Sequence, residues 1–226
     1  MQLIKSRGII IFWILLVLDC YYTFDGKDIE ANYLRMVLVP LLAVYFFLNI
    51  RKNHNSTYKL YLFLAFVFSW LSDVFMAFSG SSFIIISILG SIVMYVFYGL
   101  SLHKAKPFKL QKSQEAFFGL IIAGLICYVL YNFIDVNLGS YRIPVIIIMI
   151  AITAIFVLAC NIYGSTARRI LAVGYFIPSA ILFAISAICV ALNKFYYHEP
   201  YLNVVALLTY GYGQSVIIEG FCKMLK

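Results

Sequence analysis

An aspartate stands inside one of the most apolar stretches of this chain, FSWLSDVFMAFSG, which runs from Phe68 to Gly80. A charged side chain at mid-membrane depth costs about 2.5–3.5 kcal/mol on insertion scales, so such residues face the interior of a bundle. Asp73 can exchange a proton, which makes it a candidate for acid–base chemistry. It can equally be a protonated carboxyl that bonds two helices, with Ser69 and Ser72 beside it. Its position alone leaves both roles open.

Few other polar side chains interrupt the apolar segments. Asp19 and Arg35 both stand near the outer end of their segments, at a depth compatible with that of Asp73. Polar groups at one depth can meet in the interior of a bundle, where they satisfy each other. Further polar residues within the apolar segments include Asn161, Thr209, Gln214 and Glu219.

Metal and cofactor chemistry have no support in the sequence. The five cysteines form no CxxC pair, and the histidines His54, His103 and His198 fall in three separate loops. These spacings do not fit the usual zinc sites. No nucleotide-binding glycine motif and no Ser-His-Asp order occurs either. We therefore expect neither a metal nor a cofactor.

The elements that must position these side chains are membrane-spanning helices. Of the 226 residues, 64% are hydrophobic and only 12% are charged, whereas a soluble domain carries about 25% charged residues. Apolar runs of roughly 20 residues, the length that crosses a bilayer, follow one another along the chain. They predict an all-α, polytopic transmembrane helix bundle that forms a single domain, residues 1–226. The eight expected spans lie near residues 4–23, 34–50, 60–78, 83–102, 116–134, 143–161, 170–192 and 201–222.

Lysine and arginine gather on one side of the predicted bundle. With a cytoplasmic N-terminus and eight spans, 13 of the 17 Lys and Arg residues lie inside and the other four lie outside. Basic residues of membrane proteins are enriched in cytoplasmic loops, so the net charge of +8 indicates no nucleic-acid partner. We expect both termini to be cytoplasmic and the first span to be an uncleaved anchor. The lack of a transit peptide or retention signal favours a bacterial inner membrane.

Two segments of the chain resemble each other. WLSDVFMAF in span 3 and AISAICVAL in span 7 align through the pairs Ser72/Ser186 and Ala77/Ala191. Spans 3 and 7 run in the same direction, as a duplicated four-helix unit requires. Apolar helices also resemble one another by chance, and the two explanations stay open.

Several segments occur in an order and spacing that resemble the lysoplasmalogenase-like (YhhN) family of eight-span membrane proteins. The resemblance covers most of the chain. Its most specific parts are the S-x-x-S-D run that ends at Asp73 and the pair Tyr210 and Gln214 near the C-terminus. The segments are LRMVLVPLL, FSWLSDVFMAF, GSIVMYVFY, SAILFAISAICVAL and TYGYGQSVIIEG, in spans 2, 3, 4, 7 and 8.

The resemblance implies hydrolysis of the vinyl-ether bond of lysoplasmalogens, which releases a fatty aldehyde and a glycerophospho-alcohol. That reaction begins with protonation of an alkene carbon and passes through an oxocarbenium-like cation, which water captures. On this analogy Asp73 is the acid and Asp19 is the second carboxylate, as in the carboxylate pairs of glycosidases. The residues that would bind the substrate, a membrane lipid or lysolipid, are Arg35, Ser69, Ser72, Tyr95, Ser186, Tyr210 and Gln214.

Three polar positions of the family are apolar in this chain. The family's second acidic residue, in an S-D pair on span 7, falls on Ala187. A lysine before the span-2 proline falls on Val39, and a histidine on span 4 falls on Ile92. In this chain Asp19 would replace the missing carboxylate, and Arg35 would replace the missing cation.

Three functions follow from these observations. A hydrolase of ether bonds, which the sequence favours, predicts that Asp73 faces a pocket shared with Asp19 or Arg35. A family member without catalysis, which binds lipid or shapes the membrane, predicts a narrow interior with Asp73 bonded to neighbouring hydroxyls. A small transporter is disfavoured by the scarcity of ionisable residues at mid-depth. The oligomeric state stays open.

Overall fold

A computed structural model describes residues 2–50, 56–78, 80–109 and 113–225 of the chain. Within these ranges the chain forms a bundle of helices and no strand. The eight longest helices are α1 (Gln2–Phe24), α2 (Asp28–Asn49), α3 (Ser56–Met76), α4 (Ser81–Ala105), α5 (Gln114–Ile134), α6 (Arg142–Tyr163), α8 (Ile177–Leu192) and α9 (Pro200–Leu225).

The expected eight-span bundle is confirmed, because eight helical segments of the described chain are long and apolar enough to cross a membrane. The second span begins at Asp28 rather than near residue 34. Its first turn contains Asp28 and Glu30, whose negative charges favour the N-terminus of a helix. These charges hide the start of the helix from a search for apolar runs. The third span ends at Met76, two residues before the predicted boundary.

The seventh span is built from several short pieces. The turn α7 (Arg169–Leu171) leads into a π-helical turn, η4 (Ala172–Phe176), which continues as α8 and ends in a second π turn, η5 (Asn193–Tyr197). Pro178 has no backbone N–H and cannot continue an ordinary ladder of hydrogen bonds. It lies in the first turn of α8, directly after η4, where the N–H of Ile177 bonds the carbonyl of Ala172. The seventh span therefore becomes irregular at the π turn just before Pro178.

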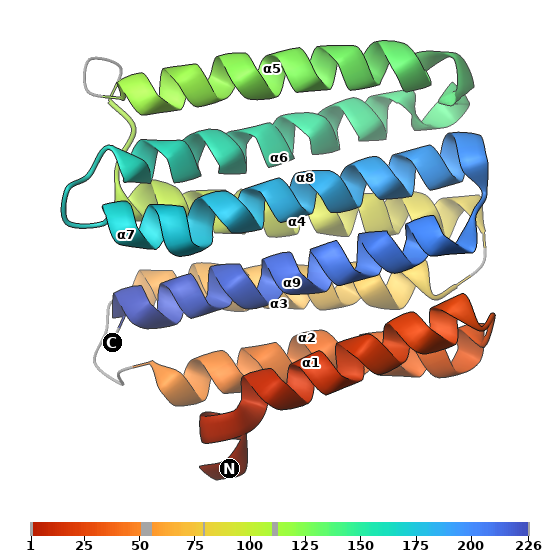
Figure 1. Ribbon diagram of the computed structural model, residues 1–226, viewed down its shortest axis with the longest axis horizontal. Helices are drawn as coiled ribbons and strands as arrows, with labels where there is room; N and C mark the ends of the chain where they lie inside the picture. Colours follow the sequence, from red (N-terminus) through yellow and green to blue (C-terminus); the bar gives the residue numbers. More distant parts are fainter. Residues whose placement is uncertain (1, 51–55, 79, 110–112, 226) are drawn as a thin grey trace.

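The long helices lie side by side, and α1 begins at the same end of the bundle at which α9 ends (Figure 1). Neighbours in sequence pair in both halves of the chain, α1 with α2 and α3 with α4, then α5 with α6 and α8 with α9. The halves also contact each other through α1 with α9 and α4 with α6. This repeated pairing is the one that a duplicated four-helix unit requires, and the duplication itself stays a prediction.

Helix α5 lies at the edge of the bundle, where it packs mainly against α6 (Figure 1). Only Ala116, Gly119 and Ile134 of this helix are buried. A Cβ atom at Gly119 would lie 3.0 Å from the sulfur of Cys160, so this glycine lets the two helices approach closely. Most of the remaining large apolar side chains of α5 face outward.

The core lies among the other helices. Its largest fully buried side chains include Phe12 of α1, Phe46 of α2, Tyr98 of α4, Phe183 of α8 and Phe221 of α9. The rings of Tyr98 and Phe183 stack, with centroids 6.2 Å apart. This stack packs α4 against α8, and the ring centroid of Phe183 also lies 6.1 Å from that of Tyr210 on α9.

Candidate functional site

A cavity of about 30 Å³ lies among α1, α2, α3 and α9. Ligand sites usually measure about 300–1,000 Å³, so this space is large enough for a water molecule but not for a lipid in the observed conformation. Most of its wall is apolar, and its polar groups come from four different helices. The lining residues are Phe12, Leu16, Asp19, Arg35, Leu38, Val39, Leu42, Asp73, Leu207, Tyr210, Gly211 and Gln214.

Asp73 lies three residues before the end of α3 and is the one residue of that helix among those lining the cavity. Among the residues that the structure describes, its carboxylate has no hydrogen-bond or ion-pair partner. It interacts electrostatically with Arg35, which attracts it, and with Asp19, which repels it. The structure thus places an unpaired carboxylate in a cavity that it shares with a second carboxylate and a cation.

The hydroxyls next to Asp73 in sequence bond elsewhere. The Ser69 hydroxyl lies 2.8 Å from the Tyr210 hydroxyl. The Ser72 hydroxyl donates to the carbonyl of Ser87 at 2.8 Å and lies 2.7 Å from the hydroxyl of Ser91. Neither hydroxyl bonds Asp73, because both side chains reach across to other helices.

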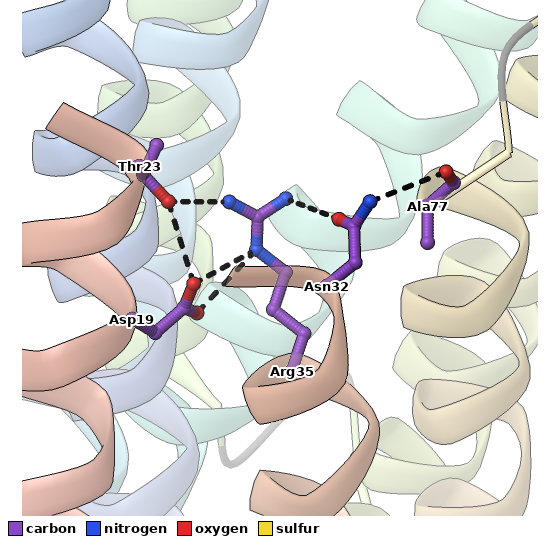
Figure 2. Close-up of polar contacts among 5 residues, drawn as sticks. All are labelled: Asp19, Thr23, Asn32, Arg35 and Ala77. Atoms are coloured by element: carbon purple, nitrogen blue, oxygen red, sulfur yellow. Dashed lines mark hydrogen bonds and ion pairs between the residues drawn. The ribbon is translucent and has the colours of Figure 1, made fainter. Parts of the chain in front are cut away.

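Asp19 and Arg35, both on the cavity wall, form a buried ion pair, 3.2 Å between Nε and Oδ1 (Figure 2). The Asp19 side chain is completely buried, and that of Arg35 is 20% exposed. The guanidinium also donates to the Thr23 hydroxyl at 2.6 Å and to the Asn32 side-chain oxygen at 3.5 Å. The Asn32 amide in turn donates to the backbone carbonyl of Ala77 at 3.4 Å. One guanidinium therefore links α1, α2 and the end of α3.

A second polar network closes the cavity toward the middle of the bundle. The Gln214 amide donates to the hydroxyls of Ser69 and Tyr210, at 3.1 and 3.0 Å. The Tyr98 hydroxyl donates to the Gln214 oxygen at 2.5 Å. Both amide atoms of a buried glutamine are thereby satisfied, as polar groups in a membrane interior require. The network holds Tyr210 with its ring against the cavity.

Four of the seven predicted substrate-binding residues, Ser69, Ser72, Tyr95 and Ser186, do not line the cavity. Ser72 faces α4, and the Ser186 hydroxyl donates to the backbone carbonyl of Ala206 at 2.8 Å. The buried Tyr95 packs edge-on against Phe183, with ring centroids 5.4 Å apart. The structure does bring Asp73, Asp19, Arg35, Tyr210 and Gln214 together around one space, with Ser69 one hydrogen bond away.

The three positions at which the chain departs from the family pattern do not all lie at the cavity. Val39 lies on the cavity wall, whereas Ala187 packs against the hydrophobic core, and Ile92 is not among the lining residues. Arg35 lies one helical turn from Val39, and residues four apart share a face of a helix. A cation placed at 35 therefore reaches the same cavity that a lysine at 39 would reach.

Thr23 and Asn32 belong to the site but were not among the residues singled out from the sequence. Thr23 lies four residues after Asp19, and Asn32 lies three residues before Arg35. At these spacings side chains are neighbours on a helix surface. A search for polar residues at helical spacing from each buried charge would have found both of them.

Gly211 lets α9 approach α1 at the cavity. A Cβ atom at this position would lie 2.6 Å from a methyl group of Leu16. We expect Gly211→Ala to lower the free energy of unfolding by about 1–3 kcal/mol, because overpacking forces neighbouring side chains to move. Thermal unfolding in detergent measures the change. The matched control is Gly124→Ala on α5, where no atom lies within 4 Å of the added carbon. Equal stability of the two variants would contradict this packing.

Known proteins offer a comparison that is independent of this geometry. The chain matches no curated protein and no solved structure. Among the described residues, no three His, Cys, Asp or Glu side chains lie together in a way that could hold a metal ion. Residues 31–221 match the model of the YhhN family. That match covers most of the chain and includes three of the four helices around the cavity, so this protein is a member of the YhhN family.

Proposed function

We propose that the protein is a lysoplasmalogenase-like hydrolase, which cleaves the vinyl-ether bond of lysoplasmalogen-type lipids and uses Asp73 as its acid. The observation that carries this proposal is the unpaired Asp73 carboxyl in a cavity shared with Asp19 and Arg35. A carboxyl that only joined helices would have a donor or acceptor on a neighbouring helix. Membership of the YhhN family supports the same reading.

The reaction needs one proton donor and one water molecule. In its protonated form, Asp73 transfers its proton to the alkene carbon that does not bear the oxygen, and the other alkene carbon becomes an oxocarbenium ion. Water adds to that carbon, and the water's extra proton returns to the Asp73 carboxylate. The resulting hemiacetal breaks its bond to the glycerol oxygen and yields a fatty aldehyde and a free hydroxyl group. General acids of this kind contribute about 10²–10⁴-fold to a rate.

Asp19 and Arg35 would assist at different stages. The carboxylate of Asp19, negatively charged in its ion pair, lies on the wall of the same cavity and can stabilise the cation. Arg35 attracts the carboxylate of Asp73 and so stabilises it after the proton has left. The apolar wall, with Phe12, Leu38 and Leu42, suits the hydrocarbon chain beside the reacting bond.

The test is aldehyde release by the purified full-length protein in phospholipid vesicles. The probe is a lysoplasmalogen, and the matched control lipid carries a saturated ether at the same position. Since only the vinyl ether has an alkene carbon to protonate, aldehyde should form from the first lipid alone. A folded protein that releases none from either lipid would refute the proposal.

A second candidate function is a lipid-binding member without catalysis. Two observations favour it: the cavity is small, and the Asp19 carboxylate is bonded to Arg35. This candidate predicts saturable binding of both lipids in the same vesicles, without aldehyde from either. The two functions therefore give opposite results in one assay.

A further inference from the structure

The cavity must open before any lipid can reach Asp73. The boundaries between neighbouring helices around the cavity, here called seams, differ in how firmly they are closed. Helices α1 and α2 are joined by the buried Asp19–Arg35 ion pair. Helices α1 and α9 meet at the close contact of Gly211 with Leu16. Each of these seams would have to break a buried polar bond or tight packing in order to part.

The seam between α2 and α3 is held differently in its two halves. At the inner half, the ring of Phe46 packs on Phe66, and that of Phe47 packs on Phe63, with centroids 5.9 and 6.2 Å apart. Aromatic pairs of this kind add to the packing energy. Within the described residues, no ring contact joins α2 and α3 at the outer half, beside the cavity, where a bond of 3.4 Å from the Asn32 amide to the Ala77 carbonyl joins them at the end of α3. The aromatic half can therefore act as the fixed end of this seam.

At the outer half, a tryptophan replaces a missing hydrogen bond of α2. Pro40 has no N–H, so the carbonyl of Met36, four residues earlier, cannot make its usual bond within the helix. The indole N–H of Trp70 on α3 donates to this carbonyl at 2.9 Å. Trp70 is 39% exposed on the outside of the bundle. This bond thus spans the seam on its membrane-facing side.

The same turn of α3 contains the candidate acid. Trp70 and Asp73 are three residues apart, and side chains at this spacing are neighbours on a helix. On α2, Val39 lines the cavity immediately before Pro40. Asp73 is the one lining residue from α3 among the described residues. Parting of α2 and α3 at Trp70 would expose Asp73 directly to the hydrocarbon of the bilayer.

We propose that the outer half of the α2–α3 seam is the lateral opening through which a lipid chain reaches the cavity, with the bond from Trp70 to the Met36 carbonyl as its latch. The inference deepens the proposed function and rests on it for the identity of the lipid. The proline both leaves the carbonyl free for the latch and lets α2 bend there, as prolines within helices do. The aromatic contacts near Phe46 form the hinge.

The experiment measures access to the cavity and not turnover. In the full-length chain with its five cysteines replaced by alanine, Val39→Cys places a single thiol on the cavity wall. The probe is a long-chain N-alkyl maleimide dissolved in phospholipid vesicles, and mass spectrometry follows the formation of the thioether. Trp70→Phe removes the indole donor and keeps an aromatic ring. We expect it to raise the labelling rate about threefold to tenfold, the range that corresponds to one hydrogen bond.

Trp13→Phe is the matched control. It makes the same substitution at the chain's other tryptophan, whose ring packs against Tyr212 of α9, with centroids 5.0 Å apart. The labelling rate should stay unchanged in this variant. Equal acceleration in both variants would mean general loosening, and no acceleration in Trp70→Phe would mean that the bond is no latch. Either result overturns the proposal.

A second comparison needs no change at Trp70. In the Val39→Cys parent, a charged thiosulfonate reagent added to the water should react much more slowly than the alkyl maleimide. Equal rates would mean that the cavity opens to water and not to the bilayer, which also overturns the proposal. Neither comparison depends on hydrolysis. If no aldehyde is released while labelling behaves as expected, the opening stands and the catalytic proposal fails.

Discussion

Asp73→Asn is expected to lower aldehyde release from lysoplasmalogen by about 10²–10⁴-fold, the contribution of a general acid. The amide keeps the shape of the carboxyl and cannot give up a proton in the same way. Because Asp73 has no hydrogen-bond partner among the described residues, the substitution leaves no bonded neighbour unsatisfied. Lipid binding and thermal stability should therefore stay close to those of the unchanged protein.

The comparison needs an aspartate outside the cavity. Asp135, whose side chain is half-buried, forms an ion pair with the exposed Arg142, 2.9 Å between the charged atoms, at the edge of the bundle. Asp135→Asn makes the same chemical change, and the rate of aldehyde release should be unaffected. If Asp73→Asn retained the full rate, then the acid in the proposed reaction would have to be another group. If both variants lost activity equally, the loss would reflect folding.

Arg35→Met is expected to give the largest loss of stability. It removes the cation from the fully buried Asp19 and breaks the bonds to Thr23 and Asn32. Removing one member of a buried ion pair costs about 3–5 kcal/mol, since an uncompensated charge stays in the interior. For a chain of this size, 1 kcal/mol corresponds to about 2–4 °C in the melting temperature. Thermal unfolding in detergent should therefore shift down by about 10 °C.

The double variant Arg35→Met with Asp19→Asn separates charge from packing. Once the uncompensated charge is gone, much of the lost stability should return, as it does when both partners of a buried pair are replaced. Lys27→Met is the control. It breaks the exposed ion pair of Lys27 with Asp25, and exposed pairs contribute little. A melting temperature unchanged by Arg35→Met would show that the Asp19–Arg35 pair does not hold α1 against α2.

The number and order of the spans could be predicted from the sequence, because the bilayer imposes a length on every apolar run. Boundaries were less certain where charge belongs to the helix itself, as at Asp28 in the first turn of α2. The position of the π turn before Pro178 could not be predicted from the sequence. A proline signals that the ladder of hydrogen bonds is interrupted, but the neighbouring helices decide where the chain adjusts.

The gathering of Asp19, Arg35 and Asp73 could be predicted, because charged groups in spans must turn inward and these lie at one depth. The directions in which the serine and tyrosine side chains face could not be predicted. A span is apolar all round, so no hydrophobic stripe marks which side faces the interior. Ser72, Tyr95 and Ser186 therefore bond or pack away from the cavity. The role of Met36 as acceptor for Trp70 could not be predicted either, because its backbone carbonyl and not its side chain accepts the bond.

The position of α5 at the edge of the bundle has a consequence for assembly in the bilayer. Lipid chains are as apolar as the outward side chains of this helix, so docking α5 gains little from hydrophobic burial. Its attachment depends instead on close packing at Gly119 and on few polar contacts, such as that of Cys127 with Thr153 at 3.3 Å. Around the cavity, polar bonds join α1 with α2 and α3 with α9. Bilayer thickness should therefore shift the tilt of α5 more than the arrangement within these two helix pairs.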